Sequence, residues 1–262
     1  MGIFDGILIC SDWDGTLHTP SGMLESDIKS IRYFQDNGGL FTVCSGRPYA
    51  YLREYWNDFA PNTYVPTLNG AVIVEPNSGR TIYRGYLDER APEIIEAIIS
   101  LDIPLAFISV HYEDCGVPVC VDVKNMNDFR AKARGRKLYK IVFVAPDVET
   151  ITELKAAIKG IDLSGYMAVS SWSTSLEILS EDSAKGAAIR RIRELTGAKT
   201  VIAVGDYEND IDMLRAADIS YAVANAHDSV KAVATRCTVS VQDGAISHII
   251  ADIKKMATSA SK

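Results

Sequence analysis

Unbroken apolar runs and helical apolar patterns alternate in the first part of the chain. The runs at residues 7–11 and 40–44 are typical of strands buried on both faces of a parallel sheet. Between them, apolar residues three or four positions apart predict a helix that Ser26 caps and the glycine pair at 38–39 ends. A second helix is predicted over residues 49–59, so this part of the chain follows the strand–helix alternation of an α/β fold.

Strands predominate in the middle of the chain. Five strands are expected there, at 104–110, 117–123, 138–145, 166–171 and 175–179. Only two helices accompany them, at 90–101 and about 148–159. Successive strands with few helices favour a separate α+β unit with a more antiparallel sheet. The α/β alternation returns from Ser183 and ends in a helix at 244–256, so one α/β domain is interrupted by a second domain.

Composition restricts the possible classes of protein. Of the 262 residues, 47% are hydrophobic, which supports a sizeable core and argues against disorder. The formal net charge of -7 disfavours nucleic-acid binding. No apolar run approaches the ~18 residues that a membrane helix needs. Five cysteines without metal-binding spacing fit free thiols in a reducing compartment, so we expect a cytoplasmic protein without nucleic-acid or membrane partners.

Polar residues stand where the predicted core strands end. Asp12 and Asp14 follow the first strand, residues 45–47 follow the second, and residues 205–210 follow a later one. Because the carboxyl ends of parallel strands meet at one edge of a sheet, these residues and Lys185 can share a site. Asp12 and Asp14 are two positions apart, and in an extended chain residues at this spacing point to the same side. Their carboxylates are therefore expected to lie close together, so either a hard cation such as Mg²⁺ neutralises them or one of them holds a proton.

Each motif alone has a simpler explanation. The run from Asp12 to Gly15 could be an ordinary turn, although its glycine comes too early for a calcium-binding EF-hand loop. Lys185 alone would be a solvated helix residue, and Asp206 alone a helix cap. Together, the carboxylates, a hydroxyl, backbone N–H groups and a lysine are the parts needed to hold a phosphate against Mg²⁺ and attack it. An aspartate is a competent nucleophile toward phosphorus.

Five motifs, in a fixed order along the chain, carry a family resemblance. They are Asp12-Trp13-Asp14-Gly15-Thr16, Ser45-Gly46-Arg47, Asn69-Gly70-Ala71, Lys185-Gly186 and Gly205-Asp206-Tyr207-Glu208-Asn209-Asp210. The chain resembles the haloacid dehalogenase (HAD) superfamily of phosphatases, specifically its Cof-type branch with a C2 (type IIB) α/β cap. The resemblance implies a Rossmann-like parallel-sheet core with helices on both faces, formed by residues 1–82 and 181–262. An α+β cap at residues 83–180, which would set substrate specificity, interrupts this core.

The resemblance implies a role for each acidic residue. Asp12 would be the nucleophile and a Mg²⁺ ligand. Asp14 would be the general acid and base, with its backbone carbonyl on the metal. Asp206 would complete the metal shell, and Asp210 would be either a further ligand or a support for the ligands. Thr16 is expected to bond within its own loop.

The resemblance also implies a phosphate site. Four residues would hold the transferring phosphoryl group: Ser45, Gly46, Lys185 and Asn209. Two others, Arg47 and Asn69, would border the substrate.

The function that follows from these roles is Mg²⁺-dependent hydrolysis of a small phosphorylated metabolite, such as a sugar phosphate, through an aspartyl-phosphate. We expect a monomer or a homodimer. One alternative is a phosphomutase of hexose phosphates, because Asp14 is kept in mutases as well as in hydrolases. The other is a sugar-phosphate-binding regulatory protein without turnover, against which the complete set of Asp12, Asp14, Lys185 and Asp206 argues. The sequence does not identify the substrate.

Overall fold

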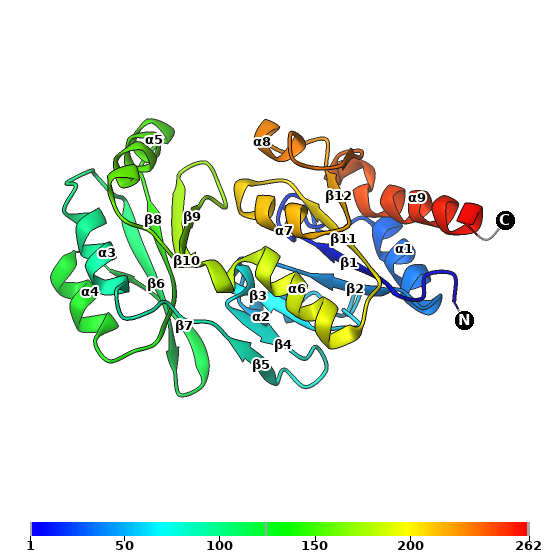
Figure 1. The fold of residues 1–262 in the computed structure, drawn as a ribbon, viewed down its shortest axis with the longest axis horizontal. Coiled ribbons are helices and arrows are strands. Elements are labelled where there is room, and N and C mark those ends of the chain that lie inside the picture. The colour runs from blue at the N-terminus through cyan, green and yellow to red at the C-terminus, as the bar shows by residue number, and fades with distance from the viewer. Residues whose placement is uncertain (1, 124, 261–262) are drawn as a thin grey trace. The chain divides into compact units, whose positions relative to one another are not determined.

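The computed structural model describes residues 2–123 and 125–260, which divide into two compact units (Figure 1). One unit, the core unit, contains the chain up to Tyr83 and from Lys185 onward. The other, the inserted unit, is Arg84–Ala184. Within the described part of the chain, no helix is both long and apolar enough to cross a membrane.

The core unit is organised around a five-stranded parallel sheet. Its strands are β1 (Ile7–Ser11), β2 (Leu40–Val43), β11 (Thr200–Gly205), β12 (Ile219–Ala222) and β13 (Arg236–Cys237). They lie in the order β13-β12-β11-β1-β2, and Ile9 of the central β1 is opposite Phe41 on one side and Ile202 on the other. All three side chains are buried, as expected for a strand covered on both faces.

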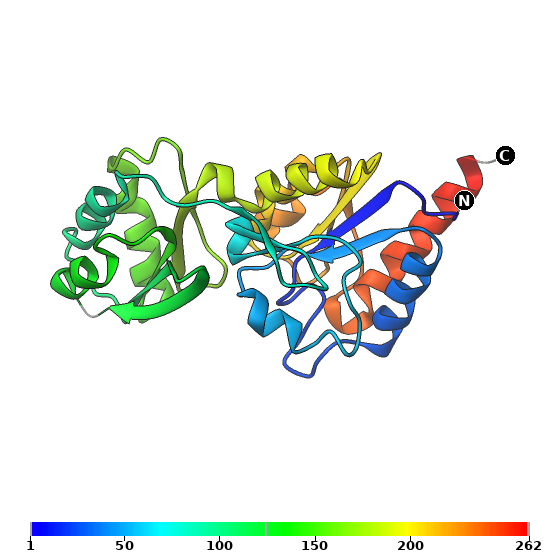
Figure 2. The same ribbon diagram turned by 90° about the horizontal axis from the view of Figure 1, so that it is seen from below.

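Helices cover both faces of this sheet. On one face α1 (Glu25–Asp36) packs against α9 (Ala245–Ala260), and on the other α6 (Lys185–Thr196) packs against α7 (Ile211–Ala216). In Figure 2 the yellow α6 lies on one side of the strands, and the blue α1 and the red α9 lie on the other. The predicted parallel-sheet core with helices on both faces is therefore confirmed.

Two predictions about the first helices are wrong. The first, α1, begins at Glu25 and has Leu24 as its N-cap, so Ser26 lies inside its first turn and caps nothing. The second, α2, covers only Tyr49–Arg53. Beyond it the chain continues in turns, where backbone N–H groups bond three residues back, as from Tyr55 to Leu52. Aromatic residues lose rotamer freedom in a helix, which weakens its continuation.

Smaller elements complete the core unit. A three-stranded sheet contains β3 (Val65–Thr67), β4 (Val72–Val74) and β5 (Thr81–Arg84), in that order. A short helix, α8 (Asp228–Lys231), follows β12. Neither β5 nor α8 is predicted from the sequence, because both are too short to show a period.

The inserted unit contains one antiparallel sheet. Its strands are β6 (Phe107–Asp114), β7 (Val117–Val123), β8 (Leu138–Val144), β9 (Tyr166–Val169) and β10 (Ser175–Ser180), in the order β7-β6-β8-β10-β9. Three helices accompany it: α3 (Ala91–Ile99), α4 (Met126–Ala133) and α5 (Val148–Ala157). Their apolar side chains, such as Ile95, Phe129 and Leu154, form one buried cluster with those of the strands. The sequence predicts two of these helices and misses α4, which is short and buries only Phe129 and Ala133.

A buried carboxyl group joins the two helices on one face of the core unit. Asp27 of α1 accepts a hydrogen bond of 2.7 Å from the backbone N–H of Ser247 in α9. Its second oxygen is buried without a hydrogen-bond partner in the described part of the chain. Burial raises the pKa of Asp27 above its ordinary value, although the bond from Ser247 opposes the rise.

This raised pKa makes the stability of the core unit depend on pH. A carboxyl group whose pKa is higher in the folded state stabilises the fold below its unfolded pKa and loses that contribution as pH rises. We expect the free energy of unfolding of the wild type, relative to Asp27→Asn, to fall as the pH rises above the ordinary aspartate pKa of 3.8 in urea titrations. Asp36→Asn, an exposed change on the same helix, is the control and should show no such trend. A difference that grows with pH would contradict the assignment.

Candidate active site

The parallel sheet brings the first and the last motif together. The backbone N–H of Asp12 donates to the carbonyl of Val204, at 2.8 Å, so the end of β1 lies beside the end of β11. On the other side, the N–H of Cys44 donates to the carbonyl of Ser11, also at 2.8 Å. Three polar strand ends therefore meet at one edge of the sheet, as the sequence predicts.

Three carboxylates and one lysine form the centre of this edge. Oxygens of Asp12, Asp206 and Asp210 lie within 4.8 Å of one another. The Nζ of Lys185, at the start of α6, is 2.5 Å from Asp12 Oδ1 and 2.6 Å from Asp210 Oδ1. The lysine is 1% exposed and Asp210 is 0% exposed, so this pairing is screened little by water.

Burial and mutual repulsion shift the pKa values of these groups. Burial, followed by the charge of Asp210, raises the pKa of Asp12, and Lys185 opposes the rise. The same two causes raise the pKa of Asp206 to about 6. Burial alone would lower the pKa of Lys185, but the charges of Asp12 and Asp210 outweigh it and raise that pKa. The lysine is thus held in its charged form, whereas the carboxylates lack enough positive charge around them.

The cluster fits a divalent cation by charge and by ligand chemistry. Ionised Asp12, Asp206 and Asp210 carry three negative charges against the single positive charge of Lys185, which leaves an excess of two. Carboxylate oxygens are the ligands that a hard cation such as Mg²⁺ prefers.

Asp210 acts on its neighbours through both carboxylate oxygens. One oxygen accepts from Lys185, and the other accepts from the backbone N–H groups of Asp206 and Tyr207, at 2.9 and 3.1 Å. With both oxygens engaged in this way, Asp210 is better suited to positioning Asp206 and Lys185 than to ligating a metal.

The loop after β1 packs directly on Asp206. Thr16 Oγ1 donates to Asp206 Oδ1 at 2.7 Å, so the expectation that Thr16 bonds within its own loop is wrong. Gly15 has a φ of +80°, and a Cβ there would lie 2.5 Å from Asp206 Oδ2. Only glycine combines this backbone conformation with such a close approach. The loop therefore holds Asp206 in place from a distance of 190 residues along the chain.

Asp14 lies in a different environment from Asp12. Arg47 donates two hydrogen bonds to its carboxylate, from Nε to Oδ2 at 2.8 Å and from Nη2 to Oδ1 at 3.1 Å. It belongs to no cluster of three potential metal-binding side chains in the described residues. Asp14 and Asp12 therefore have different partners, Arg47 for the one and Lys185 for the other. The chain turns at Trp13, whose carbonyl accepts from the N–H groups of both Leu17 and His18.

The pairing of Asp14 with Arg47 is close but weak. Both side chains are 48% exposed. Ion pairs at such positions contribute only about 0–1 kcal/mol, because water screens them and two long side chains must be ordered. The Asp14–Arg47 bond also raises the pKa of the guanidinium above its ordinary value.

Hydrogen bonds join the second motif to the third, and the third to the last. Ser45 is buried, and its Oγ accepts from the N–H of Arg47 at 3.1 Å, which leaves the hydroxyl proton for another acceptor. The N–H of Asn69 donates to the carbonyl of Ser45 at 2.9 Å. Asn209 Nδ2 in turn donates to Asn69 Oδ1 at 3.2 Å. These bonds bring Ser45, Asn69 and Asn209 together, although they are far apart in the sequence.

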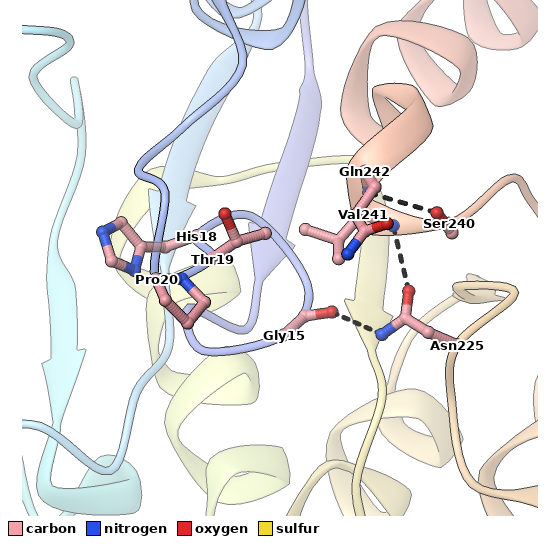
Figure 3. A pocket seen from close by; sticks show the side chains of 8 residues that line it. All are labelled: Gly15, His18, Thr19, Pro20, Asn225, Ser240, Val241 and Gln242. Carbon is pink, nitrogen blue, oxygen red and sulfur yellow. Dashed lines mark hydrogen bonds between the residues drawn. The ribbon is translucent and has the colours of Figure 1, made fainter.

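A cavity of about 360 Å³ adjoins the loop at Gly15. Asn225 spans its wall, donating to the Gly15 carbonyl at 2.8 Å and accepting from the Val241 N–H at 2.9 Å (Figure 3). No carboxylate lines the cavity, whose walls are formed by Gly15, His18, Thr19, Pro20, Asn225, Ser240, Val241 and Gln242. Its lining contains no carboxylate, lysine or arginine, so none of the charged groups of the Asp12–Lys185 cluster lines it.

The chain is similar to known proteins along most of its length. The haloacid dehalogenase-like hydrolase family matches residues 9–250. A 5-amino-6-(5-phospho-D-ribitylamino)uracil phosphatase of Bacillus subtilis, YitU, is 24% identical over 264 residues, which cover 93% of this chain and 96% of that protein. A haloacid dehalogenase-like hydrolase from B. subtilis has a similar structure, with a TM-score of 0.79, 21% identity and coverage of 93% and 98%. The structure of a HAD subclass IIB sugar phosphatase is also similar, with a TM-score of 0.74 and 18% identity, and the match covers 94% of this chain and 98% of that chain.

The chain belongs to the haloacid dehalogenase-like hydrolases, because the family match spans most of its length. The predicted family resemblance is confirmed by this match, and the structural likeness confirms the fold. The chain is an enzyme of this class, and phosphatase activity is what the names of its curated relatives share.

One supporting residue, Asp212, is not predicted from the sequence. Asp212 Oδ2 accepts from the N–H of Gly186 at 2.7 Å and so fixes the start of α6, from which Lys185 projects. Asp212 lies just beyond the last motif and has no signal that distinguishes it from an ordinary first-turn acid. A Cβ on Gly186 would lie 2.6 Å from the Asp212 carbonyl oxygen.

Gly186→Ala should therefore destabilise the core unit. Alanine favours a helix by about 1 kcal/mol over glycine, but overpacking against a backbone atom costs about 1–3 kcal/mol. We expect a net loss in the free energy of unfolding, measured in urea. Gly160→Ala, where nothing lies within 4 Å of the added Cβ, should be neutral or stabilising. Equal effects of the two changes would show that the contact with Asp212 is not limiting.

Proposed function

We propose that the protein is a Mg²⁺-dependent phosphatase that hydrolyses a small phosphorylated metabolite through an aspartyl-phosphate on Asp12. The observation that carries this proposal is the buried group of Asp12, Asp206 and Asp210 with the Lys185 ammonium between two of them. Structural ion pairs rarely contain more acids than bases in a buried place, because unpaired buried charge is costly. Such an excess is useful where a cation and a phosphate are to be bound.

In the first step, an oxygen of Asp12 attacks phosphorus. A bond forms between this oxygen and phosphorus while the bond from phosphorus to the leaving alcohol breaks. Asp14 donates its proton to the departing oxygen. Lys185 and the Ser45 hydroxyl hold the equatorial oxygens of the phosphoryl group, whose negative charge is spread over them in the transition state.

In the second step, water attacks the phosphorus of the aspartyl-phosphate. Asp14, now ionised, accepts a proton from the water, and the bond to Asp12 breaks to release inorganic phosphate. Arg47 holds the ionised form of Asp14 in a fixed orientation through two hydrogen bonds. Gly46 and Asn209 border the phosphoryl group, and Asn69 positions Asn209.

Asp12, Asp206 and the backbone carbonyl of Asp14 would hold Mg²⁺, with Asp210 and Thr16 orienting Asp206. When bound, the metal supplies positive charge that offsets the charge of the phosphoryl oxygens and of Asp12.

The names of the similar proteins indicate a class of substrate. One similar protein is named for a phosphorylated ribitylaminouracil and another for sugar phosphates, so a small phosphorylated metabolite is the common denominator. We assign the core to residues 1–82 and 181–262, and specificity to the inserted cap at 83–180. The named relatives favour neither a mutase nor a binding protein without turnover. Free thiols at all five cysteines support a cytoplasmic location.

The nucleophile is tested by phosphate release. Across a panel of sugar, nucleotide and cofactor phosphates, wild type should release phosphate with Mg²⁺ and should stop when EDTA is added. Asp12→Asn should lose at least about 10³-fold in kcat, because the attacking oxygen is gone. The exposed Asp36→Asn should match wild type. Release that survives Asp12→Asn would contradict the mechanism, and isomerisation without release would indicate a mutase.

The metal site is tested by titration calorimetry with MgCl₂ and no substrate. Wild type should bind one Mg²⁺, and Asp206→Asn should weaken binding by at least about tenfold, since a carboxylate ligand becomes a neutral amide. Thr16→Val should weaken binding less, because it removes only the bond that orients Asp206. The proposed site would be wrong if Asp206→Asn bound Mg²⁺ as tightly as Asp36→Asn.

A further inference from the structure

A row of side chains leads from α2 to Asp14. Arg47 precedes α2, Tyr51 lies in it, and Tyr55 lies in the turn that follows it. The guanidinium carbon of Arg47 lies 4.8 Å from the centre of the Tyr51 ring. The Tyr55 hydroxyl donates to the Tyr51 hydroxyl at 3.3 Å. Arg47 thus contacts the ring of Tyr51 and also donates two hydrogen bonds to the carboxylate of Asp14.

The row is anchored in the residue between the two catalytic aspartates. The Tyr55 ring lies 5.2 Å from the Trp13 ring and 4.8 Å from the His18 ring, and His18 stacks on Trp13 at 4.9 Å. Trp13 is fully buried. The contacts therefore form a closed circuit, from Trp13 through Tyr55, Tyr51 and Arg47 to Asp14, which is the neighbour of Trp13 in the chain.

We propose that Tyr51 is a positioning residue, whose ring keeps the Arg47 guanidinium against the carboxylate of Asp14. The proposal rests on the function given above, in which Asp14 protonates the leaving alcohol. A half-exposed ion pair does not by itself order a long arginine side chain. A ring beneath the guanidinium removes much of that freedom, because cations are attracted to the faces of aromatic rings and arginine stacks on them.

The role predicts an effect that depends on the leaving group. An alkyl alkoxide needs a proton to leave, whereas p-nitrophenolate leaves readily without one. Tyr51→Leu should therefore lower kcat/KM, which covers the steps up to departure of the alcohol, about tenfold on the alkyl phosphate that wild type hydrolyses fastest, and less than about twofold on p-nitrophenyl phosphate. Tyr51→Phe keeps the ring and should recover most of the alkyl-phosphate activity.

The experiment compares Tyr51→Leu, Tyr51→Phe, Arg47→Ala and the double variant Tyr51→Leu/Arg47→Ala on both substrates. If Tyr51 acts through Arg47, the double variant should be no slower than Arg47→Ala alone. Tyr33→Leu is the matched control, because it removes another cation–ring contact of 4.8 Å, from Lys254, on the helices α1 and α9. It should leave both activities unchanged.

Three results would overturn the proposal. They are an equal loss on both substrates, an equal loss in Tyr51→Leu and Tyr51→Phe, and additive losses in the double variant. All three require an active wild type that depends on Asp12. They are therefore distinct from failure of the proposed function, in which wild type releases no phosphate or Asp12→Asn retains activity.

Discussion

The ammonium group of Lys185 is the contact on which the rest of the site depends. It is buried between Asp12 and Asp210, and burying a charge is costly unless partners surround it. Removing the lysine would leave two carboxylates without their cation in a poorly hydrated place. The supporting residues serve this arrangement: Asp212 fixes the helix start that carries the lysine, and Asp210 bonds the backbone that carries Asp206.

The fold makes this contact possible by ending neighbouring strands at one edge. Lys185 and Asp12 are 173 residues apart, yet β1 and β11 pair in parallel and deliver Asp12 and Asp206 side by side. The inserted unit leaves the core chain after β5 and returns just before α6, so the insertion does not interrupt the sheet. Close approach is then set by small residues, as where Gly15 lets the first loop touch Asp206.

The sequence predicts what depends on local pattern and strand ends. Unbroken apolar runs identify β1 and β2, and polar residues after them identify the edge where Asp12, Ser45 and Asp206 meet. It fails where a tertiary contact decides. Thr16 reaches Asp206 rather than its own loop, and α4 forms around an Asn125 cap and two buried side chains that give little periodicity. The different partners of Asp12 and Asp14 likewise depend on tertiary contacts, with Lys185 and Arg47.

These contacts explain how one short motif supplies two different carboxyl groups. Asp12 is 6% exposed and surrounded by acids and a lysine, whereas Asp14 is half exposed and faces a single arginine. Carboxyl groups in such different surroundings take different roles, one at phosphorus and one at the leaving oxygen. The turn that begins at Trp13 separates the two environments, and the aromatic contacts of the same Trp13 lead back to Arg47. One residue, Trp13, therefore contributes its carbonyl to the turn and its ring to the contacts that lead to Arg47.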